Sequence, residues 1–372
     1  MGVEALFESF VSKRHEIARE WKRCSRPVVG WTCSYTPEEL VYAAGALPVM
    51  VWGGLGDTRL ADAYMPSNSC SFARGCFNAV LKGEYNYLDA LVETSSCDNR
   101  GKTYDMYVNY AKIPNVYFIN APITNTEKAH EFYYREVVKF KEWLERTFGT
   151  KVSDDSLRNA VEVYNENRAF LREIYDLKMK KPPLISGSEF MEIALSGLVM
   201  PKDEHNRLLR QFLGSVEGRA DFPREGVRLL VSGSVMDNPE LVRLVESVGG
   251  NVVADDLCTG SRYFWDSVEL DGDPLKAIAR RYLNKVPSSF MFQHGERFKH
   301  TVDLAKRFDV DGIVMFVIKY CDTHMFDAPL LRDELKAVGL PVLYLEWEHS
   351  LSGLAGLKTR IEAFIEMVGG VK

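Results

Sequence analysis

The stretch from Gly312 to Asp322 constrains the fold most strongly. Six consecutive residues, Ile313–Ile318, are apolar, and Cys321 and Asp322 follow them closely. An unbroken apolar run of this length predicts a strand buried on both faces, as in a parallel sheet covered by helices on its two sides. Cys321 is then expected just beyond the carboxyl end of a central strand, where open α/β sheets bind their ligands.

The same pattern occurs earlier in the chain, at residues 88–98. An apolar run again ends in a cysteine and an aspartate, Cys97 and Asp98. In both places a polar helical stretch, a proline and another apolar strand follow, at 114–119 and at 341–345. The two halves therefore resemble distant copies of one strand–helix–strand design, each offering a cysteine from the same place. The alternative is that each cysteine is simply a small buried apolar residue.

Composition and charge narrow the class of protein. The chain has 372 residues, too many for one core, and this length predicts two or three domains. The net charge of −6 and the lack of a basic stripe argue against a nucleic-acid partner. We find no signal peptide and no apolar run near the ~20 residues of a membrane span. Seven cysteines without a secretion signal predict a reducing, cytoplasmic location and thiols that act as such or as ligands.

The expected fold class is α/β, with two domains whose parallel sheets are joined by a helical region. Residues 1–125 form the expected N-terminal α/β domain. Residues 126–222 are charge-rich and helical in pattern and form the linker region. Residues 223–372, which begin with the strand Val227–Gly233, form the C-terminal α/β domain.

Two loops are candidates for substrate binding. The first follows the strand Leu47–Trp52 and contains Trp52, Gly53 and Gly54, but it lacks the full GxGxxG spacing of a dinucleotide site. The second, Leu257–Trp265, combines aromatic residues with Arg262 and could line a ligand pocket. The alternative for this loop is that its aromatic residues cover an edge of the core. The chain contains no P-loop, so it is not expected to bind ATP itself.

Three cysteines are candidate metal ligands. Cys70 opens a helix that runs to about Leu81, and a helix N-terminus favours a thiolate. Cys97 and Cys321 lie at strand ends. Asp98 and Asp322 are expected to orient the two cysteine loops by accepting backbone N–H groups, or else to be helix N-caps.

Two metal centres remain open from the residues alone. A zinc ion would take thiolates together with His324. A [4Fe–4S] cluster would take one thiolate on each of three irons and leave the fourth iron open. Of the seven histidines, His205, His294 and His324 are the candidates for a role in proton transfer.

Several segments, in order along the chain, resemble one known family, that of the 2-hydroxyacyl-CoA dehydratases and the ATP-dependent (class I) benzoyl-CoA reductases. The segments are Pro37–Val49, Val51–Gly54, Ser69–Cys70, Ser96–Asp98, Val161–Arg168, Ala254–Asp256 and Lys319–Asp322.

This resemblance implies that the two α/β domains are flavodoxin-like. It implies a [4Fe–4S] cluster held by Cys70, Cys97 and Cys321. It also implies a homologous iron–sulfur subunit as partner, and a separate ATP-hydrolysing iron–sulfur protein that supplies electrons. The reaction would begin with one-electron reduction of an acyl-CoA thioester. A third branch of the family carries a double-cubane cluster, and we expect it to need more cysteines than these three.

The resemblance leaves three functions in competition. Residues 200–205 and 255–264 look more like the aromatic reductase, which is our first candidate. A dehydratase that uses a ketyl radical is the second, although Thr323 stands where dehydratases tend to have a proline after Cys-Asp. The third is a non-catalytic subunit that relays electrons. Outside this family, a zinc-dependent hydrolase using Cys97, Cys321 and His324 is the remaining alternative.

Overall fold

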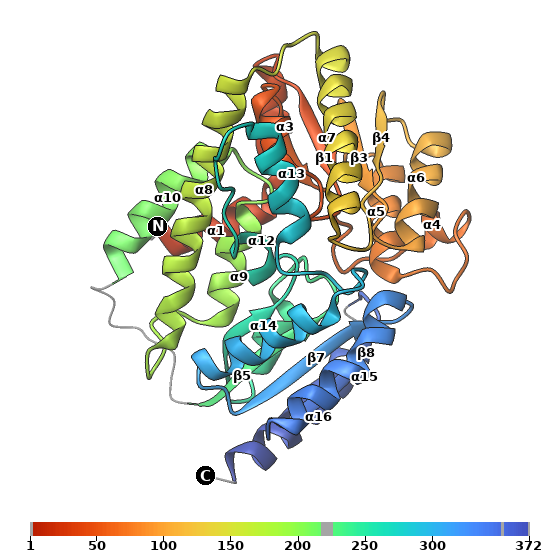
Figure 1. Ribbon diagram of the computed structural model, residues 1–372. Helices are drawn as coiled ribbons and strands as arrows, with labels where there is room; N and C mark the ends of the chain where they lie inside the picture. The colour runs from red at the N-terminus through yellow and green to blue at the C-terminus, as the bar shows by residue number, and fades with distance from the viewer. Residues whose placement is uncertain (1–2, 217–225, 351–352, 371–372) are drawn as a thin grey trace.

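The computed structural model describes residues 3–216, 226–350 and 353–370. The expected domain boundary at residues 222–223 lies outside this described part. The division into three segments therefore stays a prediction. Figure 1 shows the N-terminal half above the C-terminal half, with long helices along one side of both.

Two four-stranded parallel sheets form the framework of the molecule. The first has the order β2-β1-β3-β4 and the second the order β6-β5-β7-β8. The strands are β1 (Val28–Trp31), β2 (Leu47–Met50), β3 (Ala90–Thr94), β4 (Val116–Ile119), β5 (Val227–Gly233), β6 (Gly250–Asp256), β7 (Gly312–Ile318) and β8 (Val342–Trp347). Both sheets thus follow one topology, which confirms the α/β fold class and the repeated design.

The helices connect and cover these strands. They are α1 (Val3–Ser12), α2 (Arg14–Arg23), α3 (Glu38–Ala43), α4 (Arg59–Asp62), α5 (Ser71–Leu81), α6 (Asp98–Tyr110), α7 (Glu127–Phe148), α8 (Asp154–Asp176), α9 (Gly187–Ser196), α10 (Lys202–Val216), α11 (Glu240–Glu246), α12 (Ser261–Phe264), α13 (Pro274–Asn284), α14 (His294–Arg307), α15 (Asp322–Ala337) and α16 (Leu354–Gly369). In each sheet the first strand along the chain, β1 or β5, lies between the second strand on one side and the third strand on the other. The connections between the parallel strands carry helices, as parallel pairing requires.

Alternate residues of the first sheet enter two different cores. Val28 packs in one hydrophobic cluster and its neighbour Val29 in the other, as side chains of a strand point to opposite faces. All seven residues of β7 are buried. The expectation that this apolar run is a strand covered on both sides is therefore confirmed.

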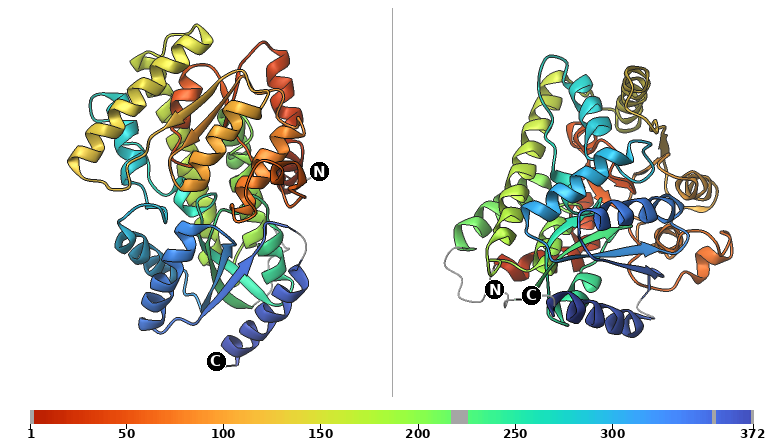
Figure 2. Two further views of the ribbon diagram at one scale, coloured as in Figure 1. Left: turned by 90° about the vertical axis from the view of Figure 1, so that its right-hand side faces the viewer. Right: turned by 60° about the horizontal axis from the view of Figure 1, so that its bottom comes forward.

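The connection between β6 and β7 carries a helix back to the N-terminal half. Helix α13 packs against α7 and α8, and the hydroxyl of Tyr282 accepts a hydrogen bond from the Glu38 N–H at 3.1 Å. Figure 2 shows this excursion from a second side. Asp273 caps α13 and Pro274 is its first residue, which is an ordinary start signal. This segment was not predicted from the sequence.

Gly53 brings the loop after β2 into direct contact with α5. A Cβ atom at position 53 would lie 2.2 Å from the carbonyl carbon of Gly75. We expect Gly53→Ala to lower the free energy of unfolding by about 2 kcal/mol or more, because the backbone of α5 must move to admit the methyl group. Urea denaturation measures this loss.

Gly56→Ala is the matched control, because nothing lies within 4 Å of a Cβ atom at that position. If the two variants were equally stable, the tight approach of α5 to the loop would be refuted.

Candidate functional site

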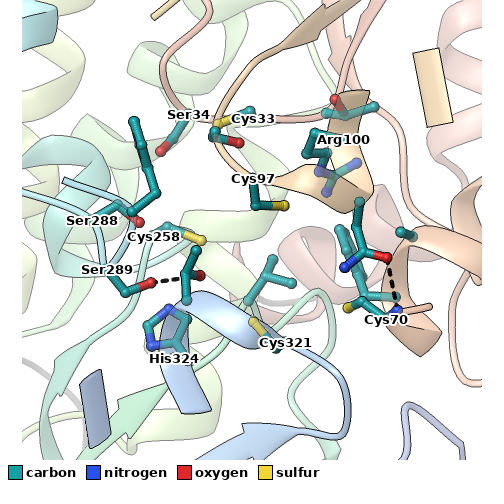
Figure 3. Close-up of a pocket in the computed structure, with 18 of the residues that line it drawn as sticks. Cys33, Ser34, Cys70, Cys97, Arg100, Cys258, Ser288, Ser289, Cys321 and His324 are labelled. Atoms are coloured by element: carbon teal, nitrogen blue, oxygen red, sulfur yellow. Dashed lines mark hydrogen bonds between the residues drawn. The ribbon is translucent and has the colours of Figure 1, made fainter. Parts of the chain in front are cut away.

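A cavity lies where the carboxyl ends of the two sheets come together. Its walls come from the segments that follow β1, β2, β3, β5, β6 and β7, together with the start of α5 (Figure 3). Five cysteines line it, namely Cys33, Cys70, Cys97, Cys258 and Cys321. Strand ends of a parallel sheet are the usual position for a ligand site.

The three cysteines predicted as ligands share this cavity, and each one is the N-cap residue of a helix. Cys70 precedes α5, Cys97 precedes α6 and Cys321 precedes α15. The thiols of Cys70 and Cys321 are hydrogen-bonded to each other. Three helix N-termini therefore point their positive ends at one place, which suits an anionic group held by thiolates.

One asparagine ties the three cysteine loops together. Asn99, in the first turn of α6, accepts a hydrogen bond from the backbone N–H of Cys70 at 3.1 Å. Its amide group also donates to the carbonyl of Tyr320 at 3.4 Å. Asn99 is two residues from Cys97, and Tyr320 directly precedes Cys321. This residue was not predicted from the sequence, since nothing in its local pattern reveals two partners so far away in the chain.

Cys33 and Cys258 were not predicted as part of the site. Cys33 follows the end of β1 by two residues, and Cys258 follows the end of β6 by two residues. The signal that identified Cys97 and Cys321, a cysteine just past a strand, was therefore present for these two as well.

Buried cations surround the thiols. Arg100 lies 3.4 Å from the carboxylate of Glu93 and stacks over Phe72. The hydrogen bond from Cys321 lowers the pKa of Cys70, and the N–H groups of α5 and the charge of Arg100 act in the same direction. Burial raises the pKa of Cys97 to about 11, although Arg100 opposes this.

Lys285 supplies a second cation behind the cavity wall. Its ammonium group donates to the carbonyl and the hydroxyl oxygen of Ser34, at 2.6 and 3.0 Å. Burial lowers the pKa of Lys285 to about 7, while the charges of Cys33 and Cys258 favour its protonated form. The charge of Lys285 opposes the effect of burial, which raises the pKa of the Cys258 thiol.

Asp98 and Asp322 lie at the mouth of the cavity. Each is the first residue of its helix, directly after the cysteine that caps it, so the alternative that they are N-caps is wrong. Both side chains are exposed and line a groove that the cavity opens into. In the described part of the chain neither carboxylate accepts a hydrogen bond, so their orienting role stays a prediction.

None of the four residues predicted to bind substrate lines the cavity. Trp52 is buried in the core, and Gly53 packs on α5. Gly54, in the same loop, has a positive φ of 64°. Arg262 is buried and pairs with Asp256, its Nε lying 3.0 Å from Oδ1. The aromatic residues beside it, Tyr263 and Phe264, are buried too. A substrate role for these four residues therefore stays a prediction without support from this geometry.

The histidines fall in different places. His324 lines the cavity, and burial together with Arg297 and Arg262 lowers its pKa well below the ordinary value. His205 lies elsewhere, buried on α10 between Asn167 and the carbonyl of Ile193. The side chain of His294 lies outside the described part of the structure.

The cavity side chains are not arranged as the ligands of one metal ion. Among the described residues, no three histidine, cysteine or carboxylate side chains are grouped around a position for one metal ion. Cys97, Cys321 and His324 therefore form no ready zinc site. In a [4Fe–4S] cluster each thiolate binds its own iron, so the thiolates need not converge on one point.

Comparison with known sequences identifies the family. A family model described as 2-hydroxyglutaryl-CoA dehydratase, D-component, matches residues 33–368. The chain belongs to this family. The resemblance found in the sequence is thereby confirmed.

Curated relatives of this dehydratase D-component family align with nearly the whole chain. One is the (R)-phenyllactyl-CoA dehydratase beta subunit of Clostridium sporogenes, 28% identical, with 94% of each chain covered. Another is a benzoyl-CoA reductase subunit from Thauera aromatica, 24% identical, with 98% of this chain and 96% of the relative covered. A third is the (R)-2-hydroxyglutaryl-CoA dehydratase subunit beta of Acidaminococcus fermentans, 26% identical, with 98% and 100% covered.

These relatives are subunits of dehydratases and of a reductase, so the family is one of enzyme subunits and includes both branches. In the described residues we find no helix with the length and apolarity needed to cross a membrane.

Loss of the Asn99 amide should loosen the three cysteine loops. We expect Asn99→Leu to lower the free energy of unfolding by about 1–3 kcal/mol, because the Cys70 N–H and the Tyr320 carbonyl lose their partner. Chemical denaturation checks this. Asn109→Leu on the same helix is the control, since Asn109 is exposed and bonds only the carbonyl of Asp105. Equal stability of the two variants would show that Asn99 links nothing.

His205 should make the protein sensitive to acid. Burial lowers its pKa from 6.5 to about 3. The unfolded chain therefore binds a proton that the folded chain does not, and stability is lost as the pH falls below 6.5. We expect up to about 1.4 kcal/mol of loss per pH unit from this group.

Urea unfolding between pH 7.5 and 5 should show a shallower pH slope for His205→Gln than for the wild type. His130→Gln, on the half-exposed side of α7, should keep the wild-type slope. An unchanged slope in His205→Gln would show that this histidine does not carry the effect.

Proposed function

We propose that the chain is the iron–sulfur subunit of an enzyme that reduces an acyl-CoA thioester by one electron. The observation that carries this proposal is the cavity, in which Cys70, Cys97 and Cys321 cap three helices. Membership of the dehydratase D-component family and the relatives' names support the substrate class.

These three thiolates would hold a [4Fe–4S] cluster, and such a cluster, when bound, supplies single electrons. The helix N-termini and Arg100 offset the negative charge of the thiolates, while Asn99 fixes the loops that carry them. Trp31, Met50 and Phe290 line the cavity and exclude water. A dry site of low polarity strengthens every charge interaction in it.

Hydroxyl groups form the remaining wall. Ser34, Ser288, Ser289 and Thr323 face the cavity, and Ser289 donates a hydrogen bond to Thr323 at 3.0 Å. Ser288 is fixed by its backbone N–H, which donates to the Tyr35 hydroxyl. In our proposal the hydroxyls of Ser34, Ser288 and Thr323 donate hydrogen bonds to the thioester oxygen as negative charge develops on it, while Ser289 orients Thr323.

The reaction itself has two candidates. Our first is a benzoyl-CoA reductase-type reduction of an aromatic ring, which the sequence favoured through residues 200–205 and 255–264. In the structure these segments contact each other, with Lys202 donating to the Tyr263 hydroxyl at 2.9 Å in the buried core. Because these contacts lie in the buried core, the likeness of the two segments to the reductase is weaker evidence for an aromatic substrate. The second candidate is dehydration of an (R)-2-hydroxyacyl-CoA, supported by the 28% identity to the phenyllactyl-CoA dehydratase subunit.

The proposal includes partners and a location. We infer a homologous iron–sulfur subunit and an ATP-hydrolysing electron donor, because the relatives are named as subunits and this chain has no P-loop. We place the complex in the cytoplasm. A subunit that only relays electrons is the remaining alternative, and it predicts a cluster indifferent to acyl-CoA.

The test is anaerobic co-purification with the partner subunit, followed by iron and sulfide analysis and EPR spectroscopy. We expect a reducible iron–sulfur signal that is abolished or strongly reduced in Cys70→Ala, Cys97→Ala and Cys321→Ala, because each removes an iron ligand. Cys24→Ala is the control, because Cys24 is exposed and does not line the cavity. A protein without iron, or with zinc in its place, would refute the proposal.

Added thioesters separate the candidates. Spectral change and turnover with benzoyl-CoA identify the reductase, and the same with (R)-phenyllactyl-CoA identifies a dehydratase. A cluster that responds to neither thioester would instead support the relay.

A further inference from the structure

Three lysines are buried in the described part of the chain, and one of them lacks a carboxylate partner. The ammonium group of Lys178 lies 4.0 Å from Asp255, and that of Lys202 lies 3.9 Å from Glu38. Among the described residues, no carboxylate lies as close to the ammonium group of Lys285. Burying an ammonium group is costly unless it is paired. Charge pairing therefore does not explain why Lys285 is buried.

The Lys285 ammonium group is instead held by neutral groups beside the cavity. It donates hydrogen bonds to the carbonyl and hydroxyl oxygens of Ser34, which lines the cavity. It also lies 4.1 Å from the centre of the Tyr35 ring and 5.8 Å from that of Tyr282. A hydroxyl that accepts a hydrogen bond still has its own hydrogen to donate. Lys285 and Ser34 thus form a chain of two proton-carrying groups that ends at the cavity.

A second pocket borders Lys285 as well. Its volume is about 250 Å³, and its wall includes Lys285, Asp266, Arg281 and Asn284. Asn284 is exposed, so the pocket opens to solvent. The pocket shares no lining residue with the cysteine-lined cavity. Lys285 therefore connects a solvent-open pocket with the cavity, because it lines the first and is hydrogen-bonded to the wall of the second.

The surroundings of Lys285 favour release of its proton. Burial lowers its pKa to about 7, and the charges of Arg281 and Arg262 act in the same direction. Cys33 and Cys258 oppose this effect when they are ionised. An amine with such a pKa is present in both its forms at neutral pH, so it can give up a proton and regain one in every catalytic cycle.

We propose that Lys285, acting through the Ser34 hydroxyl, supplies the proton that the reaction in the cavity consumes. Lys285 passes a proton to the Ser34 oxygen while Ser34 releases its own proton to the substrate, and the neutral amine then regains a proton from solvent in the second pocket. In ring reduction the proton neutralises the anion formed by one-electron reduction. In dehydration it converts the departing hydroxide into water. This inference rests on the proposed function, since both uses require that the thioester react in this cavity.

The first measurement tests whether Lys285 titrates and is reached from solvent. The full chain, purified anaerobically with its partner, is labelled with trace acetic anhydride over a range of pH, and labelled peptides are quantified by mass spectrometry. We expect half-maximal labelling of Lys285 near pH 7, whereas an ordinary lysine releases its proton near pH 10.4. Lys276, exposed on α13, is the internal reference. A Lys285 labelled no more readily than Lys276 would refute the proposal.

The second measurement compares turnover of benzoyl-CoA and of (R)-phenyllactyl-CoA across variants. Lys285→Gln keeps a hydrogen-bond donor but has no proton to release, and Lys285→Arg keeps the positive charge but holds its proton too tightly. We expect both to lower kcat by about 100-fold or more, since a positioned proton donor contributes that much. Wild-type kcat should fall as the pH rises above about 7, and both variants should lack this fall. Lys276→Gln is the control and should keep the wild-type kcat and pH profile.

Circular dichroism and the iron–sulfur EPR signal verify that each variant is folded and loaded. If neither variant folds, the labelling and the pH profile of the wild type decide. Wild-type turnover, or an unchanged pH profile, in Lys285→Gln or Lys285→Arg would show that Lys285 only supports the cavity wall. That result would leave the proposed function intact. A wild type that holds no iron, or that turns over neither thioester, would instead remove the catalytic function on which the inference rests.

Discussion

The architecture depends on bringing the carboxyl edges of two parallel sheets to one cavity. Each sheet is stable because helices bury both its faces, which leaves the strand ends as the place where polar and reactive groups can be exposed. The Asn99 amide secures this meeting, since it bonds the Cys70 backbone in one half and the Tyr320 carbonyl in the other. Two neutral hydrogen bonds thereby fix three reactive side chains without adding charge to the site.

The two halves are held together by more than the cavity. The segment between β6 and β7 leaves the second sheet, packs α13 on α7 and α8, and returns through α14. On the way Lys285 reaches Ser34, and Ser288 reaches Tyr35. A buried network of Asp256 with Arg262 and Arg297 then anchors the returning chain to β6. The wall of the cavity is therefore built by the connection that joins the halves, so that movement of one half relative to the other would change the site.

Local pattern predicted much of this fold and part of the site. The apolar run of β7 and its counterpart before Cys97 identified two central strands, and their repetition identified the common topology. Local pattern could not show that Arg262 turns inward to Asp256, because burial depends on where distant segments pack. The same limit hid Asn99 and the crossing of α13. Cys33 and Cys258 are different, because each lies just past the end of a strand, as Cys97 and Cys321 do. The same local signal could therefore have identified them.

Charge balance explains why these thiols can coexist. Several thiolates in a buried space repel one another, and burial raises the pKa of Cys97 to about 11 even with Arg100 beside it. The structure opposes this with three helix N-termini on one side and with Arg100 and Lys285 on others. Arg100 is itself partnered by Glu93, whose pKa burial raises to about 7, so this carboxylate neutralises less of the arginine charge than an exposed one would. The positive charge around the cavity makes it suited to an anionic group, as the proposed cluster with its thiolates would be.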